Sequence, residues 1–231
     1  MFLSQLIFCI AVLSGNNSTS IDLSKYLILE GTLLDLRGTE VTDADLTNLR
    51  NPIFQKVRII LLSKTEVSDN GLVYLKNLPL NELDLCCTAV SNEGIEHLSD
   101  LPLRKLTLSG TKITDMGLSS LSGLPLEVLL LRNTQISDNG LRHLHTLPLR
   151  LLDLSYTRIS DNGLVYLQLL QNLQQLDLSF SDITDDGLKH IGKIPNLARV
   201  YLAGSKVSQE AVNIFRSKHP EIKVFLEMPV R

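Results

Sequence analysis

Three of the five histidines occupy the same position of a repeated sequence pattern, which makes a metal site the first chemistry to consider. His97, His143 and His190 each lie nine residues after a hydroxyl residue that ends a run of alternating leucines. They occur in alternate copies of the pattern, so two helix spacings, roughly 16–20 Å, separate consecutive histidines, whereas zinc ligands lie about 2 Å from one ion. The sequence therefore predicts histidines on helix surfaces and no metal site.

Asp153 and Asp177 form a pair whose chemistry depends on their separation. On neighbouring strands their carboxylates would lie about 5 Å apart, a distance compatible with paired-carboxylate catalysis. However, Asp35 and Asp84 stand in the same Leu-Asp-Leu pattern, and no third catalytic group accompanies them. The chain also lacks phosphate-loop, dinucleotide, metalloprotease and nucleophile-elbow motifs. We therefore expect no enzyme and no catalytic residue, and a polar contact role for the carboxylates.

Cys86 and Cys87 could bind a soft metal or act as a redox pair. Adjacent cysteines rarely form an unstrained disulfide, and only Lys105 is placed to favour a thiolate. We interpret them as small residues at a strand end and predict no cofactor. The third cysteine, Cys9, lies in an apolar leader, so no disulfide framework exists. This fits a reducing compartment or a secreted protein that does not use disulfides.

The number and spacing of the leucines indicate the secondary-structure elements that must position these residues. The chain has 49 leucines among 231 residues, roughly twice the ordinary usage, and no tryptophan. Its net charge of −3 gives no reason to expect a nucleic-acid partner. The leucines recur in a Leu-x-Leu pattern followed by a hydroxyl anchor, and the anchors are 23 to 26 residues apart. The eight anchors are Thr39, Thr65, Thr88, Thr111, Thr134, Thr157, Ser181 and Ser205.

Each repeated unit has two halves with different periods. The alternating Leu-x-Leu half predicts a strand, and apolar spacing of three after the anchor predicts a short helix. Ser137 or Asp138 is suited to cap the helix that follows, and the Asp-x-Gly glycines suggest close approach of the next unit. The anchor hydroxyl can satisfy backbone groups of the turn. Stacked units would bury a continuous ladder of leucines, with the strands on the inside of the curve.

The unit LxxLxLxxTx[IV][ST]DxGLxxLxxLP resembles the leucine-rich repeat superfamily over residues 31–231. It is most similar to the cysteine-containing type in F-box ubiquitin-ligase adaptors and to short repeats of bacterial proteins. The resemblance implies an α/β solenoid, or horseshoe, with parallel β-strands on the concave face and short helices on the convex face. It also implies a protein-binding function. The threonine anchor, the lack of room for an F-box in residues 1–30, and the missing cysteine-rich caps of animal extracellular members are departures.

Two segments organise the chain: an apolar leader with a polar linker at residues 1–20, and about eight leucine-rich repeats at residues 21–231. The apolar run in residues 1–14 is too short to span a bilayer and suits a signal peptide, although no Lys or Arg precedes it. It could instead be an apolar segment that caps the first repeat. Cytoplasmic and exported locations therefore both stay open. At the other end Ala211 replaces the repeat glycine, which predicts a capping repeat.

Alternating strand positions should point to the concave face, namely the sixth, fourth and second residues before each anchor. These positions carry five acidic and four basic residues, so we expect no strong electrostatic field on the concave face. Apolar residues at them would form one patch over two adjacent repeats and a second patch at Ile59 and Leu61. Alternatively, scattered surface apolar residues are normal. The predicted partner-binding residues are Val128, Leu130, Arg132, Leu151, Asp153, Tyr156, Asp177, Phe180 and Tyr201.

The sequence thus predicts a monomeric module that recognises an unidentified partner protein through its concave face. We expect neither nucleic-acid binding nor membrane insertion of the mature repeat domain. Two alternatives stay open: a substrate-recognition component of a ubiquitin ligase without its own F-box, and an exported bacterial surface protein. Co-purification with ligase components would favour the first, and a mature chain beginning near Gly15 would favour the second.

Overall fold

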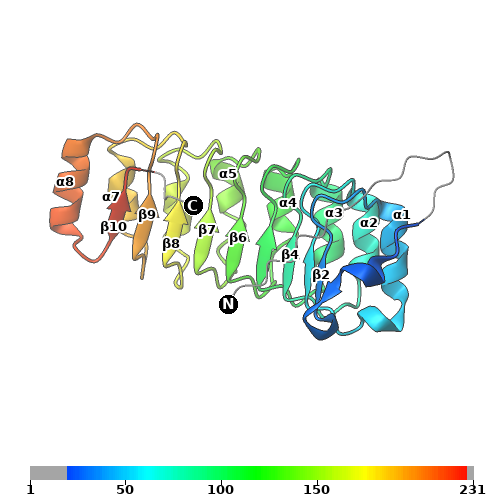
Figure 1. Cartoon of the computed structure of the whole chain (residues 1–231). Helices are drawn as coiled ribbons and strands as arrows, with labels where there is room; N and C mark the ends of the chain where they lie inside the picture. The colour runs from blue at the N-terminus through cyan, green and yellow to red at the C-terminus, as the bar shows by residue number, and fades with distance from the viewer. Residues whose placement is uncertain (1–19, 228–231) are drawn as a thin grey trace, which may run out of the picture.

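The computed structural model describes residues 20–227, which form an elongated stack of strands backed by short helices (Figure 1). The predicted signal peptide and Cys9 lie outside the described residues, so export stays a prediction. Within the described part, no helix is long and apolar enough to cross a membrane.

One sheet contains the described strands, arranged in the order of the sequence. The first, β1 (Leu27–Ile28), pairs antiparallel with β2, and each later strand pairs parallel with the one before it. The parallel strands are β2 (Leu33–Asp35), β3 (Ile59–Leu61), β4 (Glu82–Asp84), β5 (Lys105–Thr107), β6 (Val128–Leu130), β7 (Leu151–Asp153), β8 (Gln175–Asp177), β9 (Arg199–Tyr201) and β10 (Lys223–Phe225).

Short helices follow the strands and line the opposite side of the stack (Figure 1). The α-helices are α1 (Asp43–Leu46), α2 (Asp69–Leu72), α3 (Asn92–Ile95), α4 (Asp115–Ser119), α5 (Asp138–Leu141), α6 (Leu164–Leu167), α7 (Gly187–Ile191) and α8 (Gln209–Lys218). Single 3₁₀ turns lie at η1 (Leu23–Tyr26), η2 (Leu29–Gly31), η3 (Thr47–Arg50), η4 (Pro52–Phe54), η5 (Val73–Leu75) and η6 (Glu96–Leu98). The predicted α/β leucine-rich repeat solenoid is confirmed.

The core is a single ladder of apolar side chains between the strands and the helices. The middle residue of each repeat strand and the leucine two positions later are buried, as for Leu83 and Leu85, both fully inaccessible. Because one unit cannot enclose these side chains alone, each repeat depends on its neighbours for burial. Most of the leucine excess therefore serves the scaffold.

A ladder of aspartate hydrogen bonds joins successive repeats at the start of the helices. Asp138 accepts the backbone N–H of Ser160 at 2.8 Å and its hydroxyl at 2.5 Å, one repeat further on. The prediction that Ser137 caps α5 is wrong, because its hydroxyl donates to Asp115 of the preceding repeat at 2.5 Å. Asp138 likewise bonds to the next repeat instead of capping its own helix. These side chains hold neighbouring repeats together.

The same aspartates explain why most of these helices have a glycine near their start. A Cβ built on Gly140 would lie 2.5 Å from Oδ1 of Asp115, and one on Gly163 would lie 2.4 Å from Oδ1 of Asp138. No real Cβ approaches an oxygen so closely. The predicted close approach of the neighbouring repeat is therefore confirmed, with an aspartate as the group that excludes a side chain.

The anchor hydroxyls form hydrogen bonds with backbone carbonyl groups of the turn that follows each strand, as predicted. The hydroxyl of Thr134, for example, donates to the carbonyl oxygen of Leu131 at 2.6 Å. The residue before each anchor has a left-handed backbone, with φ between 53° and 67°. Those residues are Gly38, Lys64, Cys87, Gly110, Asn133, Tyr156, Phe180 and Gly204. The same turn therefore accepts side chains of very different size.

The last repeat closes the core, as its sequence predicts. Its helix α8 is ten residues long and buries Val212 and Phe215, and β10 adds a final strand beside β9. Ser208 begins this helix by accepting the backbone N–H of Ala211 at 3.1 Å. The first repeat is covered differently, by β1 and the η1 turn.

Candidate functional site

The exposed side of the sheet, here called the strand face, consists of the first and third residues of each strand and the residue two positions after the third. The first and third residues of β2 to β9 are partly exposed, apart from buried Asp153 and exposed Arg199, whereas the middle residues are buried. This is the orientation that the repeat predicts. The strand face is therefore the surface that a partner could contact along several repeats at once.

A patch of partly exposed apolar residues lies on β6 and β7. Val128 pairs in register with Leu151, and Leu130 pairs with Asp153. All three apolar side chains are half-buried. They are therefore contiguous, as expected from the sequence, and border Asp153 on one side.

The second predicted apolar pair, Ile59 and Leu61, belongs to β3. Two intervening strands, β4 and β5, separate it from the β6–β7 patch and present polar residues at every outward position. The two apolar groups therefore do not merge into one surface.

An aromatic stack stands beside the β6–β7 patch. The rings of Tyr156 and Phe180 stack with their centroids 4.3 Å apart, and the guanidinium carbon of Arg132 lies 4.2 Å from the Tyr156 centroid. Both rings are exposed, by 40% and 42%. Each residue also has the left-handed backbone of its turn, which costs roughly 1–2 kcal/mol for a residue other than glycine. The chain thus tolerates strain at two side chains that remain largely open to solvent.

Two carboxylates lie next to this stack, on paired positions of β7 and β8. Asp153 is buried and accepts the backbone N–H of Ser155 at 2.9 Å and its hydroxyl at 2.6 Å. Asp177 is half-buried and accepts the backbone N–H of Ser179 at 2.9 Å. The sheet therefore brings the two predicted acidic residues together, without a third group that would complete a catalytic arrangement among the described residues near them.

Four residues that should face outward are buried instead: Asp153, Ser155, Ser179 and Ala203. The equivalent Ser63 and Ser109 are only half-buried, and there the next residue is Lys64 or Gly110. The serines of β7 and β8 precede Tyr156 and Phe180, whose rings stack over this side of the turn. The expectation of an open column is therefore wrong at these repeats, because large side chains cover it.

The two carboxylates have no ion-pair partner among residues 20–227. Burial raises the pKa of Asp177, and the charge of Asp153 acts in the same direction, whereas hydrogen bonds from the hydroxyl and the backbone N–H of Ser179 and the charge of Arg132 act against them. Arg132 donates instead to the hydroxyl of Ser155 at 3.4 Å. The site thus carries negative charge that the described chain does not neutralise.

A second aromatic stack follows on β9 and β10. The rings of Tyr201 and Phe225 lie 4.8 Å apart at an interplanar angle of 16°. Phe225 is absent from the residues predicted from the sequence, because the repeat pattern ends before the capping strand. Its alternation with buried Val224 is the signal that would have found it.

The nine predicted partner-binding residues thus occupy one continuous region over β6 to β9 and the turns that follow these strands. Only Asp153 among them is buried. Their role in binding stays a prediction.

The other candidate chemistries do not assemble into sites. No group of three potential metal ligands occurs among residues 20–227, and His97, His143 and His190 are exposed or half-buried on the helix side. Cys86 and Cys87 are free thiols with their Sγ atoms 3.1 Å apart.

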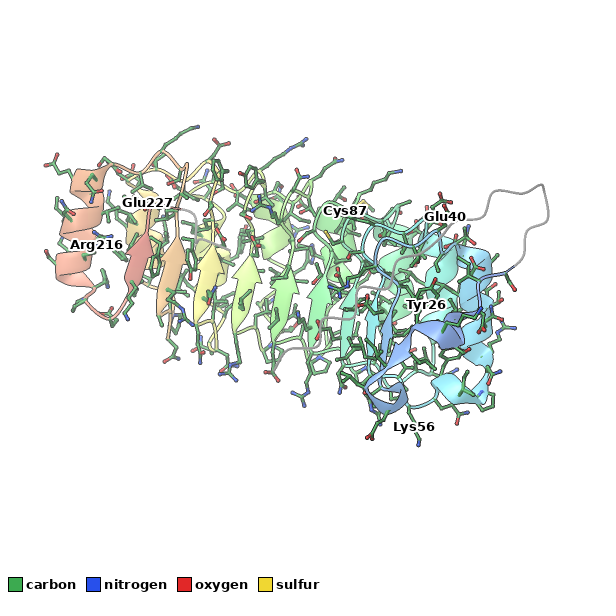
Figure 2. All side chains as sticks on the ribbon, viewed as in Figure 1. Tyr26, Glu40, Lys56, Cys87, Arg216 and Glu227 are labelled. Atoms are coloured by element: carbon green, nitrogen blue, oxygen red, sulfur yellow. The ribbon has the colours of Figure 1, made fainter. Side chains whose placement is uncertain are left out.

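Cys86 does not have the environment of a reactive thiolate. Burial and the neighbouring Cys87 raise the pKa of Cys86 to about 12. Lys105, which the sequence suggested as a source of positive charge, is paired with Glu82 at 2.6 Å. Figure 2 shows Cys87 at the edge of the sheet where the strands end, in agreement with its interpretation as a strand-end residue.

Comparison with known proteins agrees with this architecture. A family model described as "Leucine Rich repeat" matches residues 101–122, 145–167 and 170–192. None of the curated proteins matches the chain. Among solved structures, internalin C2 from Listeria monocytogenes is 25% identical, with a TM-score of 0.64, over 85% of this chain and 80% of that one. A second internalin from the same species, inlF, is 20% identical with a TM-score of 0.60, over 84% of this chain and 53% of its own length, and shows the fold alone.

Proposed function

The chain is a leucine-rich repeat protein, and we propose that it binds a partner protein through the strand face over β6 to β9. Proteins of this fold are in general interaction modules and are typically not enzymes. The finer statement, which names the surface, rests on the residues that this chain places there.

One observation carries the proposal: a partly exposed apolar patch lies directly beside exposed aromatic rings and an arginine. Val128, Leu130 and Leu151 supply the patch, and Tyr156 with Phe180 supplies the rings. Exposed apolar patches with polar rims mark interaction sites, and Tyr and Arg are prominent among residues that dominate binding energy. The patch is therefore the best-supported contact surface of the molecule.

The backbone strain at the aromatic stack supports the same surface. Glycine or asparagine would fit the turn more easily, and other repeats use them. The stacking contact of the rings, worth about 0.5–1.5 kcal/mol, does not exceed the cost of two left-handed residues, so the fold does not require aromatic side chains there. Such unrewarded strain is typical of functional sites.

The strand face is also long enough for a stable complex. Seven strand spacings of about 4.8 Å separate β2 from β9, which gives a surface roughly 34 Å long. Standard protein interfaces bury about 800 Å² on each partner. The proposed surface over β6 to β9 covers three of these spacings, so the full length of the face is available to a larger partner.

The test is affinity capture from the source organism with the full chain and a double variant, Leu130→Asp with Tyr156→Ala. We expect the wild-type chain to retain a specific protein and the variant to lose it, with a thermal unfolding midpoint lowered by only a few degrees because the ring contacts are lost. Met116→Asp is the control, because Met116 is 76% exposed on the helix side. Undiminished capture by the double variant, or equal loss with Met116→Asp, would refute the proposed surface.

A further inference from the structure

We propose that Asp177, with Asp153 on one side and Tyr201 on the other, forms a subsite of the strand face that takes an arginine side chain of the partner protein. This inference rests on the proposed function and specifies the chemistry of the partner. It follows from two features of β7 to β10: a pair of adjacent carboxylates without a counter-ion in the described chain and a free aromatic face.

Asp153 and Asp177 are adjacent carboxylates without a counter-ion in the described part of the chain, whereas two of the three other carboxylates of the strand face form ion pairs, and the third, Asp84, lies beside Leu61 and Thr107 and not beside a second carboxylate. Asp35 forms an ion pair with Arg37 at 2.6 Å, and Glu82 forms one with Lys105 at 2.6 Å. Asp153 and Asp177 stand side by side with no cationic group within 4 Å among residues 20–227. A buried carboxylate beside a half-buried one, without a counter-ion, is costly, and a cation from a partner would relieve that cost.

Two basic residues lie nearby and do not supply this cation. The Arg132 guanidinium is held over the Tyr156 ring and donates to Ser155. Arg199, at the outward position of β9 that pairs with Gln175, is exposed and makes no ion pair with any residue of the described part of the chain. The position beside Asp177 is therefore open to a cation from outside the chain.

The Tyr201 ring offers a face to such a cation. Asp177, Tyr201 and Phe225 occupy the same register position on β8, β9 and β10. Because Tyr201 stacks on Phe225, the opposite face of its ring is directed toward β8 and Asp177. No described cation lies over Tyr201. A guanidinium beside Asp177 would therefore contact both a carboxylate and a π face.

The other stack of the strand face shows the same arrangement already filled. Tyr156 stacks on Phe180, and its opposite face carries the guanidinium of Arg132. The Tyr201–Phe225 pair lacks this third member within the described chain. The parallel favours arginine over lysine, because a planar guanidinium can stack on a ring and also form a forked hydrogen bond with a carboxylate.

The experiment uses a small probe, N-acetyl-arginine-methylamide, titrated into the full chain and followed by NMR of the aspartate carboxyl carbons and the tyrosine rings. We expect saturable shifts at Asp177 and Tyr201 with a dissociation constant in the millimolar range, about −4 kcal/mol at 1 mM. The uncharged isostere N-acetyl-citrulline-methylamide should bind at least tenfold more weakly. Asp177→Asn should abolish the shift at Tyr201 while leaving the fold intact, because the amide oxygen can still accept the Ser179 N–H.

Asp84→Asn is the matched control, since Asp84 occupies the same strand position on β4. Equal binding of arginine and citrulline probes, unchanged binding by Asp177→Asn, or equal loss with Asp84→Asn would overturn the inference. So would a complete lack of saturable binding. Failure of partner capture by the wild-type chain would instead count against the proposed function, so the two outcomes are separable.

Discussion

The two halves of the strand face share one scaffold and differ in how many of their carboxylates form ion pairs. Over β2 to β5 the carboxylates Asp35 and Glu82 form ion pairs with neighbouring basic residues. Over β6 to β9 the carboxylates Asp153 and Asp177 have no such partner among the described residues. Within residues 20–227, the first half therefore pairs two of its three carboxylates and leaves Asp84 unpaired, whereas the second half pairs neither of its two carboxylates and places them side by side.

The turns after the strands show the same contrast. In the first half the left-handed position holds Gly38, Lys64, Cys87 or Gly110, and in the second it includes Tyr156 and Phe180. The backbone conformation is the same in both halves, so the side chain is free to vary without a change of fold. The comparison indicates that specificity resides in positions the scaffold does not constrain.

The largest expected effect tests whether the scaffold is uniform. Leu83 on β4 and Leu152 on β7 are fully buried at the same strand position. Replacement of either by alanine should lower the free energy of unfolding by about 2–5 kcal/mol, because it leaves a cavity in the leucine ladder. Urea denaturation of the full chain measures this. Losses that differ more than twofold between the variants would contradict a uniform scaffold.

A smaller effect should separate the two halves at the left-handed turn position. Lys64 is exposed, so Lys64→Gly should raise the free energy of unfolding by up to about 1 kcal/mol, the relief of strain minus the extra freedom of unfolded glycine. Tyr156→Gly should show no gain, because it also loses ring contacts worth about 0.5–1.5 kcal/mol. Thermal unfolding with calorimetric analysis measures both.

The control for this position is Gly38→Ala. Gly38 has φ of 67°, and a Cβ there would meet no atom within 4 Å. The variant should therefore lose about 1 kcal/mol from backbone strain alone. If Tyr156→Gly raised the free energy of unfolding as much as Lys64→Gly, the contacts of the Tyr156 ring would contribute nothing to stability.

Much of the fold could be predicted because it depends on short-range patterns. The alternation around Leu83 and Leu85 predicts a strand, and the 23-residue period predicts which strands pair. The glycines of the Asp-x-Gly pattern indicate close approach, although the group that approaches them is an aspartate of the preceding repeat. The helix-capping interpretation of Ser137 failed because the same residue types serve both a cap and a bond between repeats.

The candidate site was harder to predict, because it depends on where long side chains lie. The repeat register places Leu130, Asp153 and Asp177 on one face, as the structure does. It does not indicate that the rings of Tyr156 and Phe180 cover the adjoining serines, nor that Arg132 turns toward a ring. Rotamers of exposed side chains depend on neighbours one repeat away, and no local pattern encodes them.

The smallest expected effect is a difference in how stability depends on pH between one carboxylate of each half, Asp35 and Asp177. Hydrogen bonds from Arg37 hold the pKa of Asp35 below its ordinary value of 3.8, so Asp35 stabilises the fold above that pH and loses this contribution as the pH falls through its lowered pKa. Burial raises the pKa of Asp177, so its ionisation destabilises the fold as the pH rises above 3.8. The two groups therefore have opposite pH dependence.

Asparagine substitutions should reveal these opposite signs. At pH 7 Asp35→Asn should lower the thermal unfolding midpoint slightly, since an exposed ion pair contributes about 0.2–1 kcal/mol. Asp177→Asn should raise the midpoint at pH 7, because the buried charge is removed while an acceptor for the Ser179 N–H remains. Both differences should shrink toward pH 3, and Ser63→Ala, on the same face without a carboxylate, should show no such trend. A lowered midpoint for Asp177→Asn at pH 7 would mean that groups of the chain itself stabilise the charge of Asp177. Asp177 would then not differ from Asp35, and it would have no unpaired charge to offer a partner.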